Sequence, residues 1–174
     1  DATVLLPGGM GTLDEGFENL TLFQTGKSLP RPIILLEPEN GNYWNTWMDW
    51  IKSVLVKNKF ISPDDVHLLQ LKHSSKEAYR AIHDFYRVYH SLRYCKGLTV
   101  LRFTQPISKK IIDRLNFEFE DIVTEGTIYS SPPLQGEVQS HDNTLKMPRL
   151  IFKFDKQSFG RLNQMIRNIK EWVG

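Results

Sequence analysis

The chain has 174 residues, of which 40% are hydrophobic and 24% charged, so it can bury a core and is neither fibrous nor disordered. Its 22 basic and 20 acidic residues give a formal net charge of +2, which lacks the basic excess of a nucleic-acid-binding protein. A single cysteine, Cys95, excludes an intrachain disulfide and a cysteine-rich metal site, and no apolar run has the length of a membrane-spanning helix.

The N-terminal part of the chain alternates between strand and helix patterns. Val4–Leu6 is an apolar run that stops at Pro7, which predicts a strand buried on both faces of a parallel sheet. Residues 12–26 have helical spacing, and Gly26 is a stop signal. Similar patterns predict, in chain order, a strand at 32–36, a helix at 43–58, a strand at 66–71 and a helix from 74 to about 92. This alternation indicates a doubly wound, Rossmann-like α/β sheet.

The pattern changes after Gly97. We expect a strand at 98–103, a helix at 108–122, strands at 126–129 and 150–154, and a helix at 158–172. Residues 130–148 are polar and rich in turn-forming residues, so we expect a loop there. The order β-α-β-β-α predicts a small α+β domain of partial ferredoxin-like type. We therefore divide the chain into residues 1–95, the C-terminal portion of a Rossmann-like domain, and residues 96–174, an accessory domain.

The segment between the first strand and the first helix has the composition of a phosphate-binding loop. Pro7 ends the strand, Gly8 and Gly9 permit a turn with positive φ, and Gly11 allows a ligand close to the backbone. Thr12 stands where a helix N-cap belongs. The first helical turn would then point free N–H groups and the positive end of the helix dipole at the carboxyl edge of the sheet, where open α/β sheets bind phosphate.

Glu15 has two interpretations. It follows Thr12 by three residues, which is the spacing of a capping box, so it could serve only to cap its own helix. Alternatively its carboxylate faces the ligand, where it could stabilise a ribosyl oxocarbenium ion or orient a water, as glycosidic cleavage requires. We expect the neighbouring Asp14 to point elsewhere as a solvated acid of the first turn.

The stretch from Pro7 to Glu15 resembles the LOG family, also called lysine decarboxylase-like, because it matches Pro-Gly-Gly-x-Gly-Thr-x-x-Glu at every fixed position. Gln24 and Gly26 match a further family pattern. The resemblance implies a Rossmann-like, homodimeric nucleotide-binding protein of the cytoplasm. It also implies hydrolysis of nucleoside 5′-monophosphates, including cytokinin forms, to free base and ribose 5-phosphate. By this resemblance Glu15 is catalytic, no metal or organic cofactor is needed, and phosphate is bound by Gly8, Gly9, Met10, Gly11 and Thr12.

Later segments resemble a bacterial subgroup of this family that has an extra C-terminal domain. They are Tyr43 to Trp47, Ile61 to Asp64, Phe85 to Tyr94 and Phe159 to Leu162. The second catalytic signature of the family, a segment that contains Arg and Lys, lies upstream of the phosphate loop. We therefore expect the chain to be the C-terminal part of a longer enzyme, without the upstream half of the site.

Two other functions remain open. The same loop could belong to a non-catalytic, nucleotide-binding regulatory module, or to a carrier of a phosphorylated cofactor such as molybdenum cofactor. His83 and His90 are seven residues apart on the predicted helix and share a face, but the sequence offers no third ligand, so we expect no metal site. Nucleic acid and membrane are not expected partners.

Overall fold

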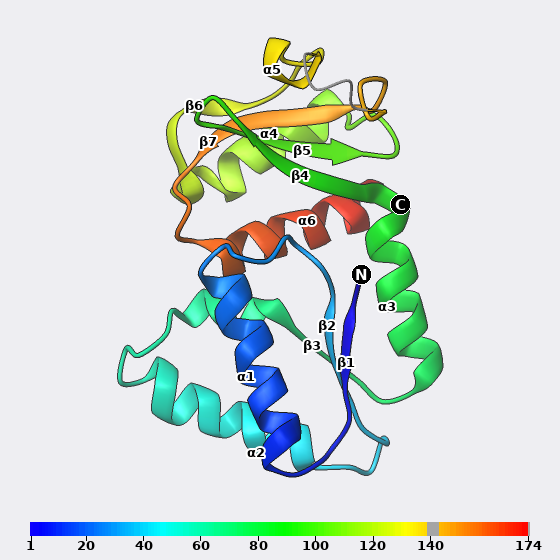
Figure 1. The fold of residues 1–174 in the computed structure, drawn as a ribbon, viewed down its shortest axis with the longest axis vertical. Coiled ribbons are helices and arrows are strands. Elements are labelled where there is room, and N and C mark those ends of the chain that lie inside the picture. The colour runs from blue at the N-terminus through cyan, green and yellow to red at the C-terminus, as the bar shows by residue number, and fades with distance from the viewer. Residues whose placement is uncertain (139–142, 174) are drawn as a thin grey trace. The chain divides into compact units, whose positions relative to one another are not determined.

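The computed structural model describes residues 1–138 and 143–173 (Figure 1). The chain divides into two compact units, Asp1–His83 with Gln157–Gln164, and Asp84–Lys156 with Met165–Gly174. The first unit holds a parallel three-stranded sheet and the second an antiparallel four-stranded sheet, which confirms the mixed α/β class. In the described residues, no helix combines the length and the apolar character needed to cross a membrane.

The parallel sheet of the first unit has the order β1-β2-β3. Its strands are β1 (Thr3–Leu5), β2 (Ile33–Leu36) and β3 (Leu69–Lys72). The connecting helices are α1 (Met10–Gln24), α2 (Tyr43–Trp50) with a π-helical continuation (Ile51–Val56), a 3₁₀ helix (Pro63–Leu68) and α3 (Ser75–Val88). The strand–helix alternation predicted from the sequence is therefore present.

One buried cluster of the first unit lies on a single face of this sheet. Leu5 pairs in register with Leu35, and Leu35 with Leu71, so that the three side chains share a face. Phe23 of α1 and Trp44 of α2 pack into the same cluster, and each is 1% exposed. Burial of each such side chain stabilises the fold by about 1.5–3 kcal/mol.

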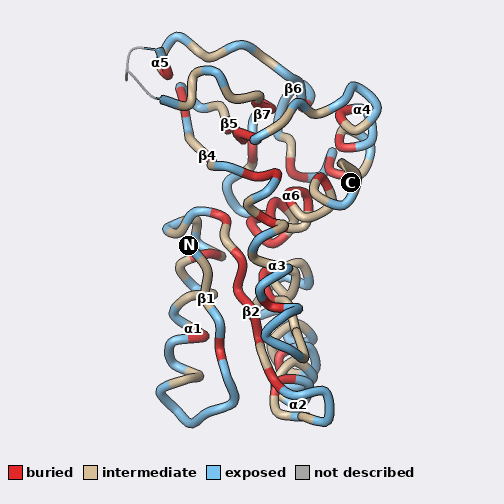
Figure 2. The backbone as a smooth tube through the Cα atoms, turned by 90° about the vertical axis from the view of Figure 1, so that its right-hand side faces the viewer, coloured by how far each residue is buried: buried red, intermediate tan, exposed pale blue. Residues whose placement is uncertain are grey.

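β2 is the central strand, and Figure 2 shows it as the buried strand of this sheet. β1 lies at an edge, and only Leu5 of its apolar run is buried, since Val4 is 43% and Leu6 60% exposed. The prediction of a strand buried on both faces is therefore wrong for β1 in this chain. The reason is its place at the edge of the sheet, since Ile34 of the central strand, which pairs with Val4, is 0% exposed.

α1 ends where the sequence predicted. Gly26 has a φ of +69°, and its N–H donates to the carbonyl of Phe23. A Cβ at Gly26 would also lie 2.2 Å from the ring of Phe159, so the position requires glycine for both its conformation and its packing.

The second unit contains one strand more than predicted. Its elements are β4 (Tyr89–Cys95), β5 (Leu98–Phe103), α4 (Lys109–Glu118), a 3₁₀ turn (Glu120–Ile122), β6 (Val123–Ser130), α5 (Gln135–Val138), β7 (Arg149–Phe154) and α6 (Phe159–Val173), whose first residues belong to the other unit. The sheet order is β4-β5-β7-β6.

The predicted helix from 74 to about 92 is wrong at its C-terminal end. α3 stops at Val88, and β4 follows at once and pairs with β5. Cys95 pairs with Leu98, so the hairpin loop consists of Lys96 and Gly97, with φ values of 48° and 84°. Two successive positive φ values match the tight hairpin turn that suits the twist of paired strands. This turn forces the preceding residues into a strand.

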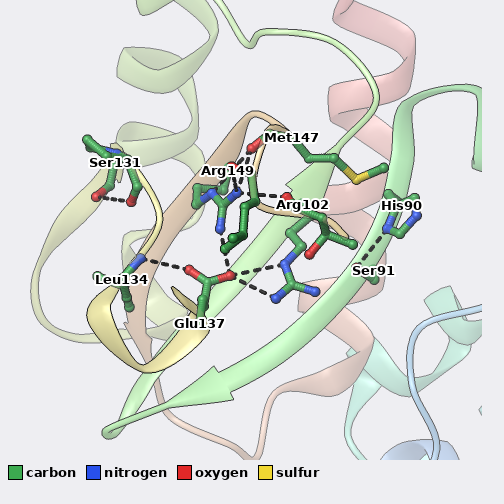
Figure 3. A network of polar contacts seen from close by, with 11 residues as sticks. His90, Ser91, Arg102, Ser131, Leu134, Glu137, Met147 and Arg149 are labelled. Atoms are coloured by element: carbon green, nitrogen blue, oxygen red, sulfur yellow. Dashed lines mark hydrogen bonds and ion pairs between the residues drawn. The ribbon is translucent and has the colours of Figure 1, made fainter. Parts of the chain in front are cut away.

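The predicted loop at 130–148 contains the short helix α5, which contacts the antiparallel sheet, and residues 139–142 lie outside the described residues. Glu137 of α5 is fully buried there between two arginines (Figure 3). Its Oε1 accepts hydrogen bonds from Arg102 Nη2 at 2.8 Å and from Arg149 Nη1 at 2.6 Å. Its Oε2 accepts from the Leu134 N–H at 3.0 Å. These contacts join the loop to β5 and β7.

Candidate functional site

The loop between β1 and α1 presents the first turn of a long helix. Gly9 is the N-cap of α1, with a φ of −89° and a ψ of −155°, and no side chain caps the helix there. The first intrahelical bond is donated by the Leu13 N–H to the Gly9 carbonyl at 3.2 Å. The N–H groups of Met10, Gly11 and Thr12 therefore precede the helical ladder. Three such groups at the positive end of a helix dipole suit an anion.

Two local expectations about this loop are wrong. Thr12 is not the N-cap but the third residue of α1. Neither Gly8 nor Gly9 has a positive φ, which among the described glycines occurs at Gly26, Gly97 and Gly126. Gly8 is needed for a steric reason instead, because a Cβ there would lie 2.2 Å from Thr12 Oγ1.

The other two loop glycines border open space. A Cβ on Gly9 or Gly11 would meet no atom of the described chain within 4 Å. α1 starts about one turn earlier than predicted, and the backbone at Gly9 and Gly11 borders open space. A ligand can approach the backbone closely from that side.

Glu15 is exposed and lies on the same face of α1 as the loop residues Gly11 and Thr12. It follows Gly11 by four residues and Thr12 by three, so its side chain starts one turn further along the same face. The capping-box interpretation is wrong, because the N-cap is Gly9 and no side-chain cap exists. Within residues 1–138 and 143–173, no hydrogen bond or ion pair occupies the Glu15 carboxylate. That carboxylate remains available to a ligand.

Asp14 lies on a different part of the helix surface. It contributes to a shallow hollow together with Met10, Gly11 and Phe17. Helical geometry turns its side chain away from the direction of Glu15 by about one residue step, or 100°. Asp14 therefore lies on the surface beside Gly11, in a direction that differs from that of Glu15.

Asn19 holds the helix that carries Glu15 against β1. Its Oδ1 accepts from the Thr3 hydroxyl at 3.0 Å and from Arg31 Nη2 at 2.7 Å. Its Nδ2 donates to the Glu15 carbonyl at 2.8 Å. The backbone at Glu15 is therefore tied to the sheet while its side chain stays exposed.

From the sequence we assigned no role at this loop to Tyr43 or Glu37, which contact or support it. The Tyr43 hydroxyl donates to the Gly8 carbonyl at 2.6 Å. Glu37, only 1% exposed, follows β2 and accepts from the Trp44 N–H through Oε2 at 3.1 Å. An acidic residue at the end of the strand after a phosphate loop is a known sequence signal, and it could have pointed to Glu37.

The two predicted histidines do not share a helix face. His83 stacks on Tyr79 with ring centroids 5.7 Å apart, whereas His90 lies on β4 and its Nδ1 is 2.9 Å from Ser91 Oγ. The prediction failed because α3 ends between them. In the described part of the chain, no three or more His, Cys, Asp or Glu side chains lie together as metal ligands could.

Comparison with known proteins bears on the first unit. Residues 1–82 match the profile of the family described as "possible lysine decarboxylase". A segment of 85 residues is 36% identical to the cytokinin riboside 5′-monophosphate phosphoribohydrolase LOG1 of Arabidopsis thaliana, and covers 49% of this chain and 38% of that protein. Residues 1–82 are therefore similar to the LOG family.

A second LOG relative has the same degree of similarity. A segment of 90 residues is 36% identical to the probable cytokinin riboside 5′-monophosphate phosphoribohydrolase LOGL6 of Oryza sativa subsp. japonica. It covers 48% of this chain and 34% of that protein. The matched part thus spans little more than a third of either relative, and the similarity covers about half of this chain.

Proposed function

We propose that the protein is a nucleoside 5′-monophosphate phosphoribohydrolase, which cleaves the N-glycosidic bond to give free base and ribose 5-phosphate. The observation that carries the proposal is the pairing of two features on α1. Three N–H groups precede the helical ladder at its first turn, and the exposed Glu15 carboxylate lies one turn further along the same face. The similarity of residues 1–82 to the LOG family, and the activities for which the two relatives are named, support it.

In this proposal the loop binds the 5′-phosphate. The N–H groups of Met10, Gly11 and Thr12 donate to phosphate oxygens, and the Thr12 hydroxyl, close beside Gly8, is a further donor. The positive end of the helix favours a nearby anion by about 0.3–2 kcal/mol, depending on how far water is excluded. Gly8 and Gly9 complete the loop, because their lack of side chains leaves its backbone accessible.

Glu15 supplies the charge that the reaction needs. As the bond from ribose C1′ to the base breaks, its electron pair leaves with the base, which takes up a proton, and positive charge develops on the ribose. A carboxylate beside the ring stabilises that charge and can orient the water that adds to C1′. With its phosphate held on the first turn, the nucleotide would place its ribose near the second turn, where Glu15 stands.

The same proposal includes the organisation implied by the family. The protein would act as a cytoplasmic homodimer on a phosphorylated small molecule. Residues 1–95 would form the nucleotide-binding part and residues 96–174 an accessory domain. These assignments rest on the resemblance of the loop and of the later segments to the LOG family.

The test is a product assay on the purified protein. AMP, GMP, CMP and isopentenyl-AMP are incubated separately, and chromatography measures free base and ribose 5-phosphate. Glu15→Gln keeps the size of the side chain but removes its charge, and we expect kcat to fall by about 10²–10³-fold, as for loss of a transition-state contact. Asp14→Asn is the matched control and should leave kcat within a small factor.

Two results would count against the proposal. Equal losses in Glu15→Gln and Asp14→Asn would contradict the assigned role of Glu15. Binding of a monophosphate without release of any base would instead support a regulatory nucleotide-binding module, and a recovered pterin would support a cofactor carrier.

A further inference from the structure

The phosphate loop is held by a residue from another helix. Tyr43 is the first residue of α2, and its hydroxyl reaches across 35 residues of sequence to donate to the Gly8 carbonyl at 2.6 Å. Gly8 and Gly9 share a trans peptide bond, in which the carbonyl and the following N–H point in opposite directions. Fixing the Gly8 carbonyl therefore also fixes the direction of the Gly9 N–H.

The loop is confined from a second side. A Cβ on Gly8 would lie only 2.2 Å from Thr12 Oγ1, so the Thr12 side chain fills the space beside Gly8. The Gly8 peptide thus lies between the Tyr43 hydroxyl and the Thr12 side chain. Rotation of this peptide would break the hydrogen bond to Tyr43, and it would re-aim the backbone donors at the start of α1.

Tyr43 is itself held in place by the end of β2. The N-cap of α2, Asn42, makes no side-chain cap, and the helix start is bound instead by Glu37 Oε2, which accepts from the Trp44 N–H at 3.1 Å. The Trp44 indole N–H donates to the Leu36 carbonyl at 3.3 Å. Both contacts tie the first turn of α2 to the strand next to β1.

Glu37 is tightly enclosed. It is 1% exposed, and a Cβ on Gly41 would lie 3.0 Å from its Oε2 and 2.9 Å from the Pro38 carbonyl. The turn after β2 therefore closes over the carboxylate, at the N-terminal end of α2 where a negative charge is favourable. Because this carboxylate is held in place and binds the Trp44 N–H, it fixes the position of the first turn of α2, which begins at Tyr43.

We propose that Tyr43 is a positioning residue for the phosphate loop, and that Glu37 acts through Tyr43 by fixing the start of α2. Affinity for a phosphate monoester then depends on hydrogen bonds that run from Glu37 to Trp44 and from Tyr43 to Gly8. This inference rests on the proposed function only in that the loop binds phosphate. The nucleoside part of a ligand does not enter it.

The test compares Tyr43→Phe with Tyr79→Phe. The first variant keeps the ring, which packs edge-on against Trp44 with centroids 4.8 Å apart, and removes only the hydroxyl. Tyr79 is 66% exposed and stacks on His83, so its variant is a matched control. Calorimetry or fluorescence titration measures the Kd values for AMP, inorganic phosphate and adenosine, and steady-state kinetics gives KM and kcat.

We expect Tyr43→Phe to raise the Kd values for AMP and inorganic phosphate by about two- to tenfold, the equivalent of one net hydrogen bond. KM should rise by the same factor with kcat little changed, because the lost contact affects binding in ground and transition states alike. Affinity for adenosine should not change, and the melting temperature should stay near that of the wild type. A merely structural role would shift the melting temperature without selecting for phosphate.

Glu37 provides the conservative comparison. Glu37→Gln keeps an oxygen that can accept from the Trp44 N–H and should bind AMP nearly as the wild type does, whereas Glu37→Ala should show the phosphate-selective loss. Equal AMP and phosphate affinities in Tyr43→Phe and the wild type would overturn the inference. If the wild type binds neither AMP nor inorganic phosphate, the proposed function itself fails, which is a different result.

Discussion

Replacing Glu137 with alanine would remove the carboxylate that binds two buried guanidinium groups of the second unit. The side chain of Glu137 is 0% exposed, and those of Arg102 and Arg149 are 5% and 0% exposed. Arg149 Nη2 also donates to the carbonyls of Thr144, Leu145 and Met147, each at 2.9 Å. The variant would remove the Glu137 contacts of both arginines.

The magnitude follows from burial. Removing one partner of a buried ion pair costs about 3–5 kcal/mol, because the remaining charge is left without compensation in a low-dielectric site. Here one carboxylate serves two cations, so we expect the upper part of this range. The total stability of a domain is about 5–15 kcal/mol, so the loss is a large fraction of what holds the second unit together. Glu137→Gln, which keeps the size of the side chain and one acceptor oxygen, should lose less.

Urea unfolding with hydrogen exchange as the readout would measure this loss. Amides of β5 and β7 report on the second unit alone, which matters because a chain of two units need not unfold in one step. Glu125→Ala is the matched control, since Glu125 pairs with Lys153 on the exposed side of β6 and β7, and exposed pairs contribute little. If Glu137→Ala destabilises these strands no more than Glu125→Ala does, the burial argument is refuted.

Further predictions concern the loop and two titrating groups. Gly8→Ala should lower the free energy of unfolding by about 1–3 kcal/mol through its clash with Thr12, and calorimetry should find no such loss for Gly9→Ala. Burial raises the pKa of Asp65, so its contribution to stability is present below the ordinary pKa and is lost as pH rises through the raised pKa. In urea titrations, the stability of Asp65→Asn relative to the wild type should therefore be higher at pH 7 than at pH 4. Burial alone would raise the pKa of Glu137, but its hydrogen bonds and arginine partners hold the pKa below its ordinary value. Its contribution to stability should therefore be lost as pH falls through the lowered pKa, and Glu137→Gln should remove this acid sensitivity.

Hydrophobic patterns located most elements, because burial imposes the strand and helix periods directly on the sequence. Residues 32–36 read as a buried strand, and Ile33, Ile34 and Leu35 of β2 are each 0% exposed. β4 was missed because apolar residues continue past the end of α3 without a conventional break. The hairpin turn that decides the matter is Lys96-Gly97, where the residue before glycine is not one of the usual Asn or Asp.

The loop motif predicted candidate site residues but not the residues that contact or support the loop. Glu15 and the glycines lie within one short segment, so their spacing is visible in the sequence. Tyr43 contacts Gly8 across 35 residues, and an aromatic residue at the start of an amphipathic helix is already explained by core packing. Glu137 and its arginines are likewise far apart in sequence, and α5 lies in a segment whose composition predicted only a loop.

Glycine patterns alone cannot tell which side of a loop a ligand occupies, and here the structure separates the possibilities. Gly8 is a glycine because the Thr12 side chain occupies the space beside it, whereas the space beside Gly9 and Gly11 is open. Gly11 and Glu15 are four residues apart on α1, so the open side of the loop and the exposed carboxylate belong to one helix face. A capping box would need a side-chain contact at the start of α1, and the N-cap Gly9 has no side-chain cap among the described residues. The coincidence of an open backbone with an exposed acid is what a phosphate-bearing substrate requires, and it is the reason to test Glu15 as the catalytic group.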